Sequence, residues 1–187
     1  MAPAVIAQML SVAEPDHTFR VLDVGCGTGV VGVSLSKLGF INLDGLDLSS
    51  QMLNEARRKG VYKEFILADL SESLYLAPST YGAVISSGTF THSHVDANAL
   101  DRIAHLLKPG AIFACTIHHA VWEEAGFART LERLGSDGVF AIEEIYDRAY
   151  FYGSGPDGRF CLLRRCHRKR KRTVEVERGD TLWVRGL

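Results

Sequence analysis

The residues with the clearest chemical meaning are the glycines and the aspartate of the segment VLDVGCGTGVVG, residues 21–32. Glycine stands at every second position of a short turn, at Gly25, Gly27 and Gly29, and Asp23 precedes the first glycine by two residues. Glycine permits a tight turn and the close approach of a ligand to the backbone. The pattern predicts a buried strand, a ligand-binding turn and a helix whose N-terminus faces the ligand.

Two classes of ligand use a turn of this kind. The spacing from Gly27 to Gly32 matches the dinucleotide fingerprint G-x-G-x-x-G, and the acidic Asp47 follows Gly27 by twenty positions. Asp23 argues against a dinucleotide, because a carboxylate beside the turn repels a pyrophosphate and attracts a cation. S-adenosylmethionine carries a sulfonium and an ammonium group and no phosphate, so these residues favour it over NAD. The alternative for Asp23 is a hydrogen bond to the amides of its own turn.

Five motifs in order along the chain resemble those of the class I S-adenosylmethionine-dependent methyltransferases. They are LDVGCGTG (22–29), GLDLSSQML (45–53), LADL (67–70), YGAVISSG (81–88) and LLKPGAIF (106–113). The resemblance implies a Rossmann-like α/β fold with a seven-stranded sheet, mostly parallel, whose seventh strand lies beside the fifth in a C-terminal antiparallel hairpin. Within the family, residues 39–53 and the following ARRKGVY (56–62) are similar to the methyltransferase-like protein of the Williams-Beuren syndrome chromosome region.

The resemblance also implies how the cofactor is held. The glycine turn receives the methionine moiety, the acidic end of the second strand holds the ribose hydroxyls, and an aspartate after the third strand reads the adenine amino group. The implied cofactor-binding residues are Asp23, Gly25, Cys26, Gly27, Thr28 and Gly29, then Asp47, Leu48 and Met52, then Asp69 and Leu70, and finally Ser87. Cys26 is expected to be a small filler of the turn and not a nucleophile.

Apolar runs alternate with amphipathic stretches, which is typical of a parallel sheet covered by helices. Strands are predicted near 20–24, 41–47, 63–68, 82–87 and 110–117, and helices near 30–38, 49–59, 96–107 and 120–134. Ser49 or Ser50 is the expected N-cap of the second of these helices, and Lys108-Pro109-Gly110 is the expected end of the third. Two strands joined by a glycine-rich loop follow Gly135, and the N-terminal segment 1–16 predicts an amphipathic helix and not a secretory signal.

Composition limits the class of protein. A chain of 187 residues with 47% hydrophobic content is enough for one domain with a core, expected over 1–167 and followed by a basic tail over 168–187. No apolar run reaches the roughly 18 residues that cross a membrane. The four cysteines show no C-x-x-C pair, so we expect reduced thiols and a cytoplasmic protein, with the nucleus as an alternative.

The charge is unevenly distributed. The run RRCHRKRKR, residues 164–172, holds seven of the 21 Lys and Arg residues, so that 14 remain against 22 Asp and Glu. The body of the protein is therefore acidic and offers no general field for a polyanion. The run itself fits a nuclear import signal, a nucleic-acid contact or simply a solvated strand end.

The methyl acceptor is expected near the residues that follow the fourth and fifth strands, Ser87 to His94 and His118 to Trp122. His92 and His118 are the candidates for a general base, because a neutral imidazole suits an acceptor O–H or N–H; the alternative is local hydrogen bonding. No metal site is predicted, since successive strand residues such as His118 and His119 point to opposite faces.

No Asn-Pro-Pro-Tyr-like motif follows the fourth strand, which disfavours the exocyclic amino groups of nucleobases as acceptors. The expected acceptor is a small molecule, with protein or RNA as alternatives. The sequence starts about twenty residues before the first strand, where family members carry a lid helix, so the lid is expected to be missing and turnover to be slow. The leading hypothesis is an S-adenosylmethionine-dependent methyltransferase; the alternatives are a catalytically silent cofactor-binding or interaction module and an NAD-dependent oxidoreductase.

Overall fold

A seven-stranded sheet forms the frame of the computed structural model, which describes residues 2–91, 95–150 and 155–167. The strand order is β3-β2-β1-β4-β5-β7-β6. β1 to β5 run parallel to one another, whereas β7 is antiparallel to both β5 and β6. The strands are β1 (Val21–Val24), β2 (Leu43–Asp47), β3 (Glu64–Leu67), β4 (Tyr81–Phe90), β5 (Leu107–His118), β6 (Phe140–Arg148) and β7 (Gly158–Arg165). The predicted α/β sheet, with its seventh strand inserted beside the fifth, is confirmed.

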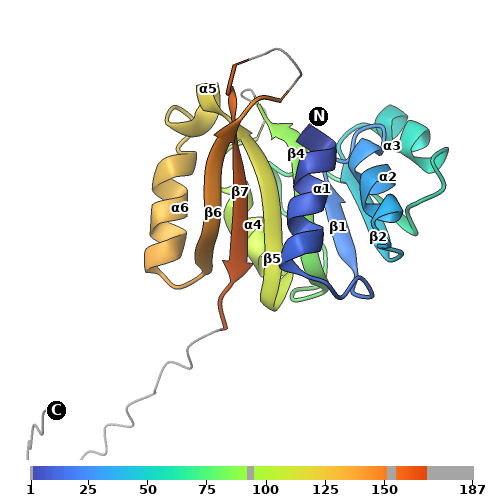
Figure 1. Cartoon of the computed structure of the whole chain (residues 1–187), viewed down its shortest axis with the longest axis horizontal. Coiled ribbons are helices and arrows are strands. Elements are labelled where there is room, and N and C mark those ends of the chain that lie inside the picture. The colour runs from blue at the N-terminus through green and yellow to red at the C-terminus, as the bar shows by residue number, and fades with distance from the viewer. Residues whose placement is uncertain (1, 92–94, 151–154, 168–187) are drawn as a thin grey trace, which may run out of the picture.

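Helices cover both faces of this sheet (Figure 1). They are α1 (Ala2–Ala13), α2 (Val30–Lys37), α3 (Ser50–Arg57), α4 (Ala99–Leu106), α5 (His119–Trp122) and α6 (Phe127–Ser136). Strand side chains alternate between the faces, so Val21 packs in one apolar cluster with α1 and α2, while Leu22 packs in another with α4 and α6. A parallel strand buried on both faces needs apolar residues at successive positions, as Val21 and Leu22 of β1 are; the buried Asp23 of this strand is the exception.

Three predicted boundaries were wrong. β4 extends to Phe90, where it pairs with Ile117, and β5 begins at Leu107. α4 ends at Leu106, so Lys108-Pro109-Gly110 does follow the helix, but it lies within a strand and not in a separate turn. A shift in the β4–β5 register falls across this segment, and such an irregularity tolerates proline. The helix predicted over 120–134 is divided into α5 and α6, because Gly126 has a left-handed φ of 78° and caps α6.

Other local predictions are confirmed. Ser49 is the N-cap of α3, and its hydroxyl accepts a hydrogen bond from the Met52 amide. The N-terminal segment forms the helix α1, which packs on the sheet through buried residues such as Ile6 and Leu10. Within the part of the chain that the structure describes, no helix has the length and apolar character needed to cross a membrane.

The basic run begins inside the sheet. Arg164 in β7 forms ion pairs with Glu14 and Glu143, and the neighbouring Arg165 donates to the carbonyls of Ala104 and Val139. These two arginines therefore hold the hairpin to the body of the protein. Residues 168–172 of the run, and the tail predicted over 168–187, lie outside the described residues.

Candidate functional site

The glycine turn lies where the strand order reverses. β1 has β2 on one side and β4 on the other, and the chain passes from Val24 through the turn into α2 at Val30. In open α/β sheets, ligands bind outside the carboxyl ends of the strands at such a switch point. The position of the turn therefore marks the candidate site.

Gly25 and Gly27 serve the turn in different ways. Gly25 has a φ of 64°, and a Cβ atom placed on it would lie 2.1 Å from the Thr89 hydroxyl oxygen. That hydroxyl donates to the Val24 carbonyl at 3.1 Å, so Thr89 is fixed against the turn. Gly27 has a φ of 53°, but no atom lies within 4 Å of the corresponding Cβ position. Gly25 thus permits tight packing, whereas Gly27 leaves the outer surface of the turn open.

Asp47 ties the turn to the next helix. It is the last residue of β2, and its Oδ2 accepts from the Gly27 amide at 2.8 Å while its Oδ1 accepts from the Ser49 amide at 2.9 Å. The carboxylate is therefore held in place from both sides. Carboxylate oxygens carry about four lone-pair sites in total, so Asp47 retains acceptor capacity for a ligand.

A cavity of about 260 Å³ opens beside this carboxylate. Four segments contribute to it: the glycine turn and the residues at or after the ends of β2, β3 and β4. Its lining combines one carboxylate, two threonines and several apolar walls: Gly25, Leu46, Asp47, Leu48, Ala68, Leu70, Gly88, Thr89, Thr91 and Val95. Apolar walls with a few convergent polar groups are typical of small-molecule sites. Of the predicted cofactor residues, Gly25, Asp47, Leu48 and Leu70 line it.

The other predicted residues lie around this cavity. Thr28 is exposed on the turn, Gly29 caps α2, and Met52 is partly exposed on α3. Ser87 lies beside the lining residue Gly88 in β4. Cys26 is buried, and burial raises the pKa of its thiol well above the ordinary value, which suits a filler of the turn and not a nucleophile.

Asp23 has a partner that the sequence analysis missed. Its side chain is 1% exposed and does not line the cavity; its Oδ2 accepts from the Tyr62 hydroxyl at 2.6 Å. Its Oδ1 is buried without a hydrogen bond among the described residues. Burial raises the pKa of Asp23 to about 7. The hydrogen bond to Tyr62 was not among the predictions for this aspartate.

Tyr62 also explains the last glycine of the dinucleotide fingerprint. Its hydroxyl accepts from the Gly32 amide at 3.1 Å, and a Cβ atom on Gly32 would lie 2.3 Å from that hydroxyl oxygen. Gly32 therefore makes room for an aromatic ring. The fingerprint match reflects packing here, and the only sequence signal for Tyr62 was its place at the end of the ARRKGVY motif.

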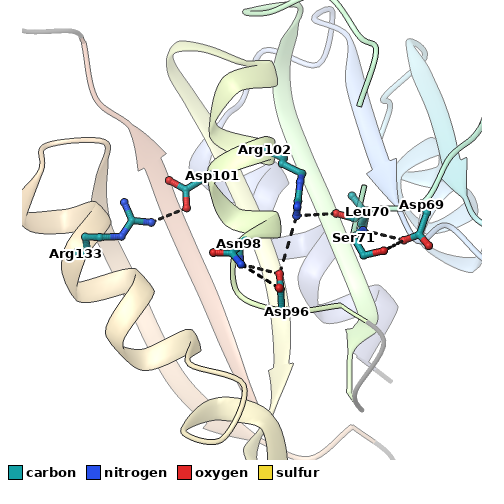
Figure 2. Close-up of polar contacts among 8 residues, drawn as sticks. All are labelled: Asp69, Leu70, Ser71, Asp96, Asn98, Asp101, Arg102 and Arg133. Atoms are coloured by element: carbon teal, nitrogen blue, oxygen red, sulfur yellow. Dashed lines mark hydrogen bonds and ion pairs between the residues drawn. The ribbon is translucent and has the colours of Figure 1, made fainter. Parts of the chain in front are cut away.

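Asp69 and Leu70 form a short turn after β3 (Figure 2). The exposed Asp69 carboxylate accepts from the amide and the hydroxyl of Ser71, at 2.8 and 2.7 Å. Asp69 lies between the lining residues Ala68 and Leu70, and the Leu70 carbonyl accepts from Arg102 of α4 at 3.0 Å. Arg102 is a second residue that the sequence analysis missed.

Of the two candidate bases, His92 lies outside the described residues. The Nδ1 of His118 accepts from the Ala120 amide at 3.1 Å and so caps α5. An amide can only donate, so this contact engages the Nδ1 lone pair of His118. The adjacent His119 pairs with Asp147 at 3.1 Å, so the two histidines have different partners.

A larger hollow of about 690 Å³ lies elsewhere, between α1 and the β6–β7 hairpin. Val5, Met9 and Leu162 contribute apolar walls, and Glu143 and Glu144 contribute carboxylates. It contains none of the residues predicted to hold a cofactor. Size alone therefore does not identify the functional site.

The fold and the site define the class of protein. A seven-stranded sheet of this order, with a glycine turn after β1 and a carboxylate at the end of β2, is the class I methyltransferase architecture. A crystal structure of an S-adenosylmethionine-dependent methyltransferase from Mesorhizobium loti superposes with a TM-score of 0.65 at 21% identity, covering 84% of this chain and 96% of that one.

Sequence comparison gives the family. Residues 21–110 match the family model described as a methyltransferase domain. Human methyltransferase-like protein 27 is 33% identical over 162 residues, which cover 82% of this chain and 65% of the relative. Over residues 21–110 the chain therefore matches the methyltransferase domain family, and its fold is that of the class I S-adenosylmethionine-dependent methyltransferases. Its narrower likeness to the Williams-Beuren-region protein stays a prediction.

More distant relatives differ in the acceptors that their names give. The ubiquinone biosynthesis O-methyltransferase of Xylella fastidiosa is 30% identical over 107 residues, covering 54% of this chain and 43% of the relative. A bovine 18S rRNA (guanine-N(7))-methyltransferase is 39% identical over 79 residues, covering 42% of this chain and 27% of the relative. The chain thus spans less than two thirds of each of these curated relatives.

Proposed function

We propose that this protein binds S-adenosylmethionine beside the glycine turn and transfers its methyl group to a small-molecule acceptor. One observation carries the proposal: a single cavity brings together Gly25, Asp47 and Leu70, which come from three different strand ends. Each of them belongs to a different motif of the family resemblance.

The residues present fit the cofactor. Leu46, Leu48 and Leu70 offer apolar walls to a flat base, and the Asp47 carboxylate offers acceptors to ribose hydroxyls. When bound, S-adenosylmethionine supplies an electrophilic methyl group on its sulfonium sulfur.

The hydrogen bonds of the turn argue against a dinucleotide. The Cys26 amide donates to the Leu46 carbonyl at 3.0 Å, the Gly27 amide to Asp47, and the Gly29 amide to the Cys26 carbonyl at 2.9 Å. A pyrophosphate needs amides of this kind as donors, and it would lie beside the Asp47 carboxylate. These contacts therefore favour S-adenosylmethionine over NAD as the ligand of the turn, and a methyltransferase over an NAD-dependent oxidoreductase.

The acceptor enters, in this proposal, on the side of the cavity formed by Thr91 and Val95, across from the β2 end. Methyl transfer mainly requires that a nucleophile be held in line with the methyl group. His92 remains the proposed base, since His118 is engaged as a helix cap. The acidic body of the protein supports a small molecule over RNA as the acceptor.

The first test is calorimetric titration with S-adenosylhomocysteine, S-adenosylmethionine and NAD in parallel. We expect S-adenosylhomocysteine to bind and Asp47→Ala to weaken it at least about tenfold, because a charge-assisted hydrogen bond is lost. Asp16→Ala is the matched control: among the described residues its exposed carboxylate accepts hydrogen bonds from Thr18 of its own turn, and the affinity should stay unchanged.

The other outcomes separate the competing functions. Binding of NAD without S-adenosylhomocysteine would overturn the proposal in favour of an oxidoreductase. Equal binding by wild type and Asp47→Ala would remove this cavity as the site. Cofactor binding without transfer to any acceptor tried would favour the silent module.

A further inference from the structure

Two walls of the cofactor cavity come from segments that no strand pairing joins. Leu70 follows β3 at one edge of the sheet, and Val95 precedes α4; both line the cavity. β3 is separated from β4 by β2 and β1, so the sheet does not fix these two segments against each other. The side chains of Leu70 and Val95 belong to one apolar core cluster, which holds the two segments together. Apolar contacts are not directional, so they do not fix the orientation of the backbone or of polar side chains nearby.

Arg102 makes the directional contact between them. It lies on α4, and its Nη1 donates to the Leu70 carbonyl at 3.0 Å and lies 4.0 Å from the Asp96 carboxylate (Figure 2). Its side chain is 29% exposed, whereas that of Asp96 is 58% exposed. An exposed ion pair at this distance contributes little, so the bond to the Leu70 carbonyl is the important one.

The peptide unit that accepts this bond is held at both ends. Its carbonyl belongs to Leu70 and accepts from Arg102, while its N–H belongs to Ser71 and donates to the Asp69 carboxylate at 2.8 Å. A peptide unit is planar, so its C=O and N–H rotate together. Loss of the Arg102 contact therefore removes one of the two bonds that hold the peptide that orients the Asp69 carboxylate.

We infer that Arg102 is a positioning residue for cofactor recognition, acting on Asp69 through the Leu70–Ser71 peptide. The inference rests on the proposed function and on the family resemblance, which implies that Asp69 reads the adenine amino group. Arg102 itself touches no cofactor in this arrangement. Its role is to fix the direction of the carboxylate that does.

The test compares S-adenosylhomocysteine with S-inosylhomocysteine, which replaces the adenine amino group by a carbonyl oxygen. Wild type should prefer the adenosine compound, because an amino group donates to a carboxylate and a carbonyl does not. In Arg102→Met the affinity for S-adenosylhomocysteine should fall about tenfold, while that for the inosine compound changes less than about twofold. Arg102→Lys, which keeps one charged donor, should restore part of the preference.

The chain offers two matched controls. Arg133→Met removes an arginine that pairs with Asp101, the neighbour of Arg102 on α4, and with Asp137 of the helix end. Asp96→Asn weakens the long ion pair and the hydrogen bonds that Asp96 accepts from Asn98, but it leaves the bond between Arg102 and the Leu70 carbonyl in place. Both variants should keep the wild-type preference between the two ligands, and thermal melting will check that all variants are folded.

The outcomes distinguish failure of the proposed function from failure of the inference about Arg102. If wild type binds neither ligand, the proposed function is overturned. If wild type binds but Arg102→Met weakens both ligands by the same factor, or weakens neither, Arg102 does not position Asp69. Should Arg102→Met not fold, Arg102→Gln is measured in the same way, and an unchanged preference in that variant overturns the inference.

Discussion

At the scale of single residues, Asp23 is the most unusual group in the protein. It is a fully buried carboxyl with one hydrogen bond, to the Tyr62 hydroxyl, and burial raises its pKa from 3.8 to about 7. The neighbouring Asp47 carboxylate adds to the shift. In the folded protein this aspartate therefore keeps a proton that the unfolded chain would release.

This raised pKa predicts a pH-dependent stability. Between about pH 4 and pH 7 the folded state binds one proton more than the unfolded state at this site, so the free energy of unfolding falls as pH rises and levels off above pH 7. Asp23→Asn, which keeps the size of the side chain and an acceptor for Tyr62, removes this term. We expect wild type to lose up to about 4 kcal/mol relative to the variant across this window.

Urea unfolding of both proteins without ligand, from pH 4.5 to pH 7.5, measures the difference. Because every other titrating group is shared, their contributions cancel in the comparison. Parallel stability curves would show that Asp23 titrates in the folded protein as it does in the unfolded chain.

Some site residues could be predicted from the sequence, because the signal that marks them lies within a few neighbouring residues. Gly25 and Asp47 belong to short motifs in which residue type and spacing carry the chemistry. Tyr62 and Arg102 could not, because their contacts join residues 30 to 39 positions apart. Arg102 bonds to a backbone carbonyl, a group that every residue has, so no spacing of residue types marks the contact.

At the scale of elements, the packing of α2 depends on Gly32. The Tyr62 ring, which precedes β3, occupies the space where a side chain at position 32 would lie. Tyr62 thereby joins α2 to β1 through its bonds to Gly32 and Asp23.

Gly32→Ala should therefore destabilise the protein although alanine is the better helix former. The propensity gain is about 1 kcal/mol, but a Cβ atom 2.3 Å from the Tyr62 ring must displace it, at a cost of about 2–3 kcal/mol or more. Gly135→Ala in α6 is the control, since its Cβ would meet nothing closer than 4.0 Å. Chemical denaturation should show a loss for the first variant and a gain for the second; a gain for both would refute the packing argument.

The ends of helices and strands could be predicted from the sequence where a neighbouring residue, such as a capping serine or a turn glycine, marks the end. Ser49 begins α3 through its own side chain, and the glycine turn ends β1, so both boundaries are visible in the sequence. The ends of β4 and β5 depend instead on pairing with each other, as Phe90 does with Ile117. Such pairing is a long-range property, which explains why both strands are longer than predicted.

At the scale of the whole molecule, two of the hollows formed by the described residues can be compared as ligand sites. The larger, about 690 Å³, lies against α1 and the hairpin, and the smaller, about 260 Å³, lies at the switch point of the sheet. The smaller one combines the glycine turn with the ends of three strands. Chemistry and topology therefore favour the smaller cavity over the larger one.

The location of bound cofactor tests this choice most directly. Ultraviolet cross-linking of S-adenosylmethionine labelled in its methyl group, followed by peptide mapping, identifies the residues beside the ligand. We predict label in peptides from 21–32 or 46–70, competed by excess S-adenosylhomocysteine. Label confined to peptides from 2–13 or 140–148, or no competable label at all, would contradict the placement of the cofactor at the glycine turn.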